Sequence, residues 1–132
     1  MTEQSRPKVL LVDDEDRFRE TMIKILRFKG MEAQGASTAH EAIEAACREH
    51  FDAVLLDMRI GEDSGLDVLR ALREKGIETE IIVLTGHARP ELPAELAGQG
   101  VSDYLLKPVE PDQIAERIES VIERSKALRR FC

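Results

Sequence analysis

Short, continuously apolar runs alternate along this chain with segments whose apolar residues recur at helical spacing. The runs cover 8–12, 51–56, 81–84 and 101–106, with a weaker one over 31–36. Continuous apolar character is typical of strands buried on both faces, because successive side chains point to opposite faces of a sheet. The alternation with helices therefore predicts an α/β domain in which helices cover both faces of a parallel sheet.

Local signals indicate where the intervening helices begin and end. Apolar residues recur at helical spacing over 18–29, and Gly30 follows as a typical helix end. Thr38 and Glu41 form the pattern of a capping box at the start of a second helix. A third helix is expected after the polar turn that follows the third strand, and Pro111 suits the first turn of the last helix.

Composition limits the class of protein. The chain has 132 residues, of which 42% are hydrophobic, so it fits one domain with a real core. Its net charge of −7 argues against binding of nucleic acid by the domain itself. It has neither an apolar run of about 18 residues, as a membrane span requires, nor the apolar stretch of a signal peptide. We therefore expect a cytoplasmic protein that does not bind a membrane.

The two cysteines, Cys47 and Cys132, form neither a metal-binding pattern nor a disulfide framework. Cys47 lies in a helical stretch with Ala42, Ile43 and Ala46, which form a small-residue face that can pack closely on a sheet. We expect Cys47 to pack in the core as part of that face.

Polar side chains close four of the predicted strands. The first strand ends in Asp13 and Asp14, the third in Asp57, the fourth in Thr85 and the fifth in Lys107. The carboxyl ends of parallel strands meet at one edge of the sheet, and ligand sites form in the crevice there. We therefore expect these side chains to converge.

The predicted cluster contains three carboxylates, which raise one another's pKa unless a cation neutralises them. Mg²⁺ is the natural cation, since it binds a few carboxylates together with water and phosphate. Lys107 offers a point charge for a phosphoryl oxygen, and Thr85 offers a hydroxyl donor next to the small Gly86. The residues thus predict a Mg²⁺ site where a phosphoryl group is transferred onto a carboxylate.

In four motifs the chain resembles the receiver domains of two-component response regulators, including the chemotaxis regulators. The motifs are 11–15 (LVDDE), 54–58 (VLLDM), 84–86 (LTG) and 104–108 (YLLKP), and the similarity extends over about 8–123. The resemblance implies a doubly wound, five-stranded parallel sheet with five helices and the flavodoxin-like strand order 2-1-3-4-5. It also implies a signalling domain that catalyses only its own phosphorylation and dephosphorylation.

The resemblance assigns roles to the site residues. Asp57 would be the phosphoacceptor, receiving its phosphoryl group from a sensor histidine kinase or a phosphotransfer protein. Mg²⁺ would bind to Asp14, Asp57 and the backbone carbonyl of Arg59, while Asp13 would act through a water molecule.

Further roles concern the switch. Thr85 and Lys107 would contact the phosphoryl oxygens, and a cis Lys107–Pro108 bond would aim the lysine into the site. Tyr104 would turn inward as Thr85 moves. That movement would repack the face formed by the fourth helix, fifth strand and fifth helix, which would bind an effector, a second copy of the chain or an output domain.

The chain departs from the family pattern near the site. Gly61 occupies a position where most relatives have proline, which leaves the loop after Asp57 less restricted. Arg59 and His87 fall at positions whose side chains line the phosphoryl site, and we hypothesise that they tune the lifetime of the phosphoryl group. Pro90 and Pro93 predict that the fourth helix is shortened or frays, or else that it is a normal helix that starts late.

Two other functions share parts of the pattern. A flavin-binding module of the same topology needs a phosphate-cradling loop after the first strand, where the acids at 13–16 would repel the phosphate. A small hydrolase with an aspartyl-phosphate intermediate fits the same residues, but it needs a second acid as general base and a cap over the substrate. Flavin colour or turnover of phosphate esters would reveal these alternatives.

The expected organisation has three parts. A polar leader covers 1–7, the receiver domain covers 8–123, and a basic segment covers 124–132. The last segment is expected to be a C-terminal tail or the start of a linker, so the chain is either a stand-alone receiver or the N-terminal part of a longer regulator.

Overall fold

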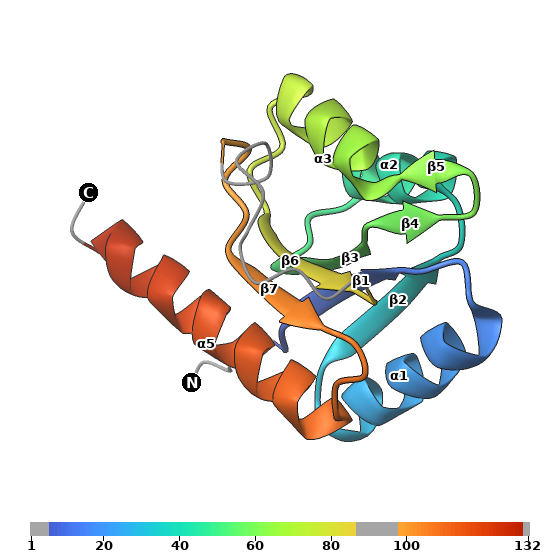
Figure 1. Cartoon of the computed structure of the whole chain (residues 1–132). Helices are drawn as coiled ribbons and strands as arrows, with labels where there is room; N and C mark the ends of the chain where they lie inside the picture. Colours follow the sequence, from blue (N-terminus) through green and yellow to red (C-terminus); the bar gives the residue numbers. More distant parts are fainter. Residues whose placement is uncertain (1–5, 87–97, 131–132) are drawn as a thin grey trace.

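A computed structural model describes residues 6–86 and 98–130 of the chain (Figure 1). The strands in this part are β1 (Lys8–Val12), β2 (Glu32–Ala36), β3 (Ala53–Asp57), β4 (Arg59–Ile60), β5 (Asp63–Ser64), β6 (Glu80–Thr85) and β7 (Asp103–Leu106). The helices are α1 (Asp16–Phe28), α2 (Ala39–Arg48), α3 (Gly65–Glu74) and α5 (Pro111–Arg130).

Five strands form one parallel sheet in the order β2-β1-β3-β6-β7. This is the predicted order 2-1-3-4-5 once the two short strands β4 and β5, which pair with each other, are set aside. The predicted doubly wound α/β fold is therefore confirmed. The central position of β1 and β3 explains why their sequences are apolar throughout, since both of their faces are covered.

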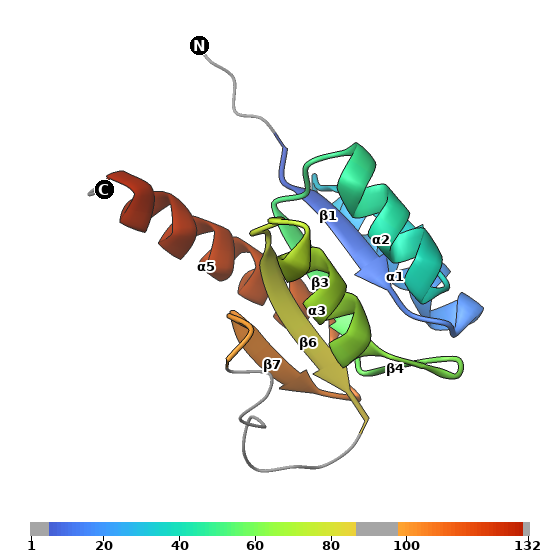
Figure 2. The same ribbon diagram turned by 90° about the horizontal axis from the view of Figure 1, so that it is seen from above.

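Successive residues of each central strand enter two different cores. Val9 and Leu11 pack in the cluster beneath α1 and α5, whereas Leu10 and Val12 pack in the cluster beneath α2 and α3. Figure 1 shows α2 and α3 above the sheet and α1 and α5 below it, and Figure 2 shows the molecule from the side of α2 and α3. At about 25 cal/mol per Å² of buried apolar surface, these clusters are the main source of stability.

The predicted capping box is present with a change of partner. Thr38 Oγ1 accepts a hydrogen bond from the Glu41 N–H at 3.1 Å, which caps α2. The carboxylate of Glu41 accepts from the N–H of Ser37 at 2.8 Å and from its hydroxyl at 3.0 Å. Glu41 therefore binds the residue that precedes the N-cap Thr38. Pro111 begins α5 as predicted.

The expectation for Cys47 was wrong, because its side chain is exposed. The buried face of α2 consists of Ala42, Ala45 and Ala46. These positions follow the i, i+3, i+4 spacing of one helical stripe, and Cys47 falls two residues after Ala45, on another side of the helix.

Other differences from the predictions concern where strands and helices begin and end. The third and fifth sheet strands begin two residues later than expected, and the turn after Asp57 contains the unpredicted hairpin β4–β5. The predicted fourth helix lies outside the described residues. Helix α5 continues without a break through 124–130. No described helix is long and apolar enough to cross a membrane.

Candidate functional site: an acidic cluster around Lys107

The sheet ladder delivers the site residues to one edge. The N–H of Asp13 donates to the Ala36 carbonyl at 3.1 Å, and the N–H of Lys107 donates to the Thr85 carbonyl at 2.7 Å. Both bonds extend parallel pairing one residue beyond a strand. Hydrogen bonds that continue the sheet ladder therefore fix the backbone positions of Asp13 and Lys107.

Three carboxylates meet at this edge. One oxygen from each of Asp13, Asp14 and Asp57 lies within 4.8 Å of the other two. Their exposure differs: the Asp13 side chain is 1% exposed and that of Asp57 13%, whereas Asp14 is exposed. The predicted convergence of the three acids is confirmed.

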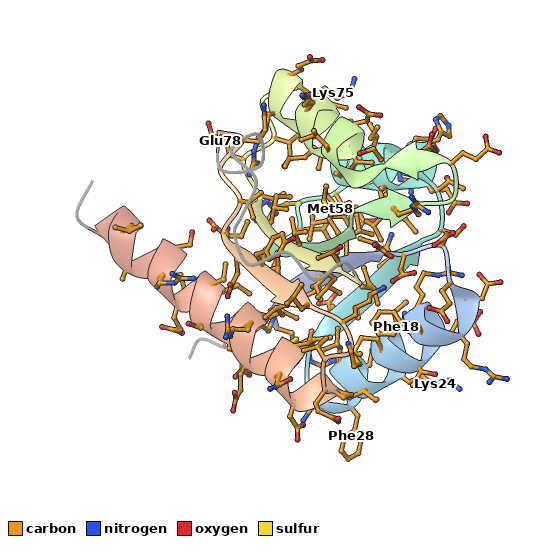
Figure 3. The ribbon with its side chains drawn as sticks, viewed as in Figure 1. Phe18, Lys24, Phe28, Met58, Lys75 and Glu78 are labelled. Atoms are coloured by element: carbon orange, nitrogen blue, oxygen red, sulfur yellow. The ribbon has the colours of Figure 1, made fainter. Side chains whose placement is uncertain are left out.

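Lys107 is the cation of the cluster. Its Nζ lies 2.8 Å from Asp13 Oδ2 and 3.1 Å from Asp57 Oδ2, and the side chain is 21% exposed. The same Nζ lies 4.6 Å from the centre of the Phe18 ring. Figure 3 shows Phe18 on α1 beside this edge of the sheet, whereas Phe28 at the other end of α1 points away from the molecule. Contacts with two carboxylates and an aromatic ring restrict the movement of the Lys107 ammonium group.

Backbone N–H groups hold each of the acids in place. The N–H of Glu15 donates to Asp13 Oδ1 at 2.9 Å, that of Arg59 to Asp57 Oδ1 at 3.1 Å, and that of Gly61 to Asp14 Oδ2 at 2.9 Å. The donors lie outside the five-stranded sheet: Glu15 and Gly61 are in loops, and Arg59 is in the short strand β4. Each carboxylate is therefore oriented by the turn that follows the first or the third sheet strand.

Gly65 explains how α3 can start directly beside Asp57. A Cβ at this position would lie 2.3 Å from the Asp57 carbonyl oxygen and 2.9 Å from Met58 Cα. The Gly65 N–H also donates to the Met58 carbonyl at 2.8 Å. Since neither backbone atom can give way, only glycine fits this close approach.

The pKa values of Asp57 and Lys107 are both raised, for different reasons. Burial raises the pKa of Asp57; the hydrogen bond from the Arg59 N–H and the charge of Lys107 lower it, and Asp13 raises it again, so that the net direction is upward. Burial alone would lower the pKa of Lys107, but its hydrogen bonds and charge interactions with Asp13 and Asp57 outweigh that effect and raise it. The surroundings of Lys107 therefore favour its charged form, whereas burial of Asp57 works against its charged form.

The remaining predicted site residues lie near this cluster to different degrees. Thr85 is buried at the end of β6, and Tyr104 is half-buried in β7, where it packs against the core beneath α3. The Arg59 side chain is exposed, and His87 lies outside the described residues. The Lys107–Pro108 bond is cis, as the resemblance implied.

The donor set suits a hard divalent cation. Three carboxylates offer oxygen atoms close together, and one of them, Asp14, has no contact with Lys107 among the described residues. Oxygen ligands at exposed carboxylates that leave room for water are typical of Mg²⁺. The residues present therefore fit this ion.

Comparison with known proteins gives the family. The family model described as the response regulator receiver domain matches residues 9–119. The chain belongs to this family. The receiver domain described here has 35% identity over 113 residues to the alginate biosynthesis transcriptional regulatory protein AlgB of Pseudomonas aeruginosa, covering 86% of this chain and 25% of that protein. It has 36% identity over 121 residues to the response regulator MprA of Mycobacterium leprae, covering 90% and 52%.

Solved structures agree with this membership. A CheY-like response regulator receiver domain protein from Methanospirillum hungatei has a TM-score of 0.85 and 27% identity, covering 93% of this chain and 98% of that one. A receiver domain protein from Clostridium thermocellum has a TM-score of 0.82 and 29% identity, covering 92% and 98%. The chain spans a quarter to about half the length of the curated relatives it matches.

The sequence did not reveal every residue that shapes this receiver site. Phe18 was expected only as part of a helical apolar stripe, and the backbone donor at Gly61 was not anticipated. Arg19 was also missed, although its guanidinium donates to the Asp13 carbonyl at 2.8 Å. A signal existed for Phe18 alone, since it lies in the first turn of the helix that follows the acidic loop.

Proposed function

We propose that this receiver domain accepts a phosphoryl group on Asp57 from the phosphohistidine of a sensor histidine kinase or phosphotransfer protein, in a Mg²⁺-dependent reaction. The observation that carries the proposal is the contact of one ammonium, that of Lys107, with both Asp13 and Asp57 where three carboxylates converge. An Asp57 oxygen attacks phosphorus, the bond from phosphorus to the imidazole nitrogen breaks, and the imidazole leaves with the electron pair. Positioning and charge neutralisation carry such transfers.

Asp14, Asp57 and the backbone carbonyl of Arg59 would hold Mg²⁺ directly, with Asp13 acting through a water molecule. When bound, the ion neutralises charge that builds up between the carboxylates and the phosphoryl oxygens. Asp57 attacks only as a carboxylate, and the contact with Lys107 favours that form against the effect of burial.

Lys107 and Thr85 contact the phosphoryl oxygens of the product. Lys107 gives up its ion pair with Asp57 and forms one with the phosphoryl group. Thr85, at the end of β6, moves toward the phosphoryl group. Tyr104, on β7, then turns inward. The phosphoryl group thereby biases a two-state equilibrium of the face that includes β7 and α5, which binds a downstream effector, a second copy or an output domain.

The side chains of Arg59 and His87 tune the lifetime of the phosphoryl group by controlling the approach of the hydrolytic water. Replacing both with alanine should change the rate at which the phosphoryl group is lost, while Asp57 still becomes phosphorylated. Following the phosphorylated mass with time tests this role. An unchanged rate of loss in the double variant would refute it.

The main experiment treats the protein with a small phosphodonor and Mg²⁺ and measures intact mass. One labile phosphate should appear in the wild type and be absent from Asp57→Asn and from samples with a chelator. A wild type that gains no phosphate would overturn the proposal. Sustained turnover of added phosphate esters would instead favour the alternative of a hydrolase with an aspartyl-phosphate intermediate.

A further inference from the structure

We propose that the backbone N–H of Gly61 is a positioning group for the metal ligand Asp14, so that the hairpin β4–β5 sets the affinity of the site for Mg²⁺. This inference rests on the proposed function, because it concerns the same metal site. Asp14 Oδ2 accepts the hydrogen bond from Gly61 at 2.9 Å, between two loops 47 residues apart in the chain.

The three acids differ in what holds them. Lys107 contacts Asp13 and Asp57, and each of these also accepts one backbone N–H. Among the described residues, Asp14 has the Gly61 N–H as its hydrogen-bond donor and no contact with Lys107. Since Asp14 is also exposed, its orientation depends on this bond more than that of either neighbour depends on a single donor.

The hairpin that supplies the donor is itself anchored. Arg59 pairs with Ser64 and Ile60 with Asp63, and the Ile60 side chain is buried. The N–H of Arg59, from the same hairpin, donates to Asp57. One short hairpin therefore orients both Asp14 and Asp57, and so sets the separation of two carboxylates that would bind the ion directly.

Glycine suits this position for two reasons. Gly61 has φ +63°, in the left-handed region, and it begins the two-residue turn that closes the hairpin. A Cβ at Gly61 would meet nothing within 4 Å, so the constraint concerns backbone conformation and not space. Proline would remove the N–H and hold φ near −65°. The residue thus supplies both the turn and the donor.

Outer groups that orient metal ligands typically account for about 10- to 100-fold in metal affinity. Because the Gly61 N–H makes a single hydrogen bond to an exposed carboxylate, we expect the lower end of that range. Loss of the Gly61 N–H should weaken Mg²⁺ binding about tenfold. The hydrogen bond leaves the other Asp14 oxygen to bind the ion, so donor and ion do not compete for one atom.

The test is a Mg²⁺ titration of the isotopically labelled 132-residue chain, followed by NMR of backbone amides near the site. Gly61→Pro should raise the Kd about tenfold. Gly61→Asn keeps the N–H and tolerates positive φ, so it should retain most of the affinity. Replacing Gly61 with glycolic acid, which makes an ester of the same shape without the N–H, should weaken binding as proline does, and it serves also if the proline variant does not fold.

Gly76→Pro is the matched control, because Gly76 has a similar φ of +78° but lies at the end of α3, away from the site. It should lower stability and leave the Mg²⁺ Kd unchanged. A second readout needs no metal: Asp14→Ala should speed hydrogen exchange of the Gly61 amide.

The outcomes separate this inference from the proposed function. If the wild type binds Mg²⁺ and the ester variant binds it equally well, the positioning role is wrong while the metal site stands. If Gly61→Asn loses as much affinity as Gly61→Pro, turn conformation and not the N–H is responsible, and the inference is again overturned. A wild type that binds no Mg²⁺ at all would refute the proposed metal site, and with it this role of Gly61.

Discussion

Two half-buried cations stand at opposite edges of the same sheet and are used in opposite ways. Lys107, at the carboxyl edge, contacts two carboxylates at 2.8 and 3.1 Å. Arg73, in the last turn of α3 near the amino edge, donates to four backbone carbonyls at 2.8–3.2 Å: those of Ile77, Thr79, Gln99 and Gly100. One cation has ionisable partners and the other has neutral ones.

The direction of each pKa shift reflects this difference. Burial lowers the pKa of Arg73, and the nearby Glu80 and Glu78 do not outweigh it, since its direct partners carry no charge. Burial acts in the same direction on Lys107, yet the carboxylates raise its pKa overall. Carbonyl groups do not change their charge, so the contacts of Arg73 with them serve the structure alone. A cation bound to carboxylates responds when their charge changes, as metal binding or phosphorylation would require.

Replacing Arg73 should have the largest effect on stability. Arg73→Ala removes four hydrogen bonds from a charged donor, and we expect it to lower the free energy of unfolding by about 3 kcal/mol. Urea unfolding measures this change. The Mg²⁺ Kd should stay at the wild-type value, because Arg73 is far from the carboxyl edge. A loss of Mg²⁺ affinity without a loss of stability would show that the two edges are not separate.

Lys107→Ala should have an effect that depends on Mg²⁺. Without the ion, Asp13 and Asp57 face each other without a cation, which should cost about 2 kcal/mol of stability, less than for a fully buried pair because Lys107 is partly exposed. Saturating Mg²⁺ should restore part of that loss, since it neutralises the same carboxylates. Unfolding is measured in chelator and in Mg²⁺. Equal losses in both conditions would contradict the role assigned to Lys107.

Phe18→Leu tests the aromatic contact with Lys107. Leucine keeps apolar contact but has no ring, so stability should fall by about 0.5–1 kcal/mol, and the NMR signals of the Lys107 CεH₂ group should lose their ring-current shift. Phe28→Leu is the matched control on the same helix, because Phe28 is 91% exposed. Identical Lys107 signals in Phe18→Leu and wild type would remove Phe18 from the site.

The smallest expected effect lies away from the site, in two surface carboxylates. Hydrogen bonds from the Ser37 N–H and hydroxyl lower the pKa of Glu41, and the hydrogen bond from Lys8 lowers that of Glu49. Their stabilisation is therefore present above the unfolded pKa of about 4.3 and is lost as pH falls through the lower folded values. Tm measured between pH 6 and pH 3 should fall less steeply in Glu49→Gln. Parallel curves would show that this pair contributes nothing.

How much could be predicted from the sequence depended on the kind of signal. Apolar runs that end in Asp13, Asp57, Thr85 and Lys107 predicted the sheet and its active edge, because strand direction brings distant residues together by a simple rule. The capping residue Thr38 was found from local chemistry alone. Cys47 was misplaced, because a helical stripe of alanines can be drawn along more than one line of α2.

The sequence by itself determined the parallel α/β fold and the acids that meet at the carboxyl edge, since burial pattern and residue type are properties of the chain. The strand order was implied by the family resemblance. Only the tertiary structure decided which groups hold those acids. The Gly61 N–H contacts Asp14, and the Phe18 ring contacts Lys107, only because the fold brings distant segments of the chain together. A backbone donor has no side-chain signature, so its role appears only when the chain brings it within 3 Å of its acceptor.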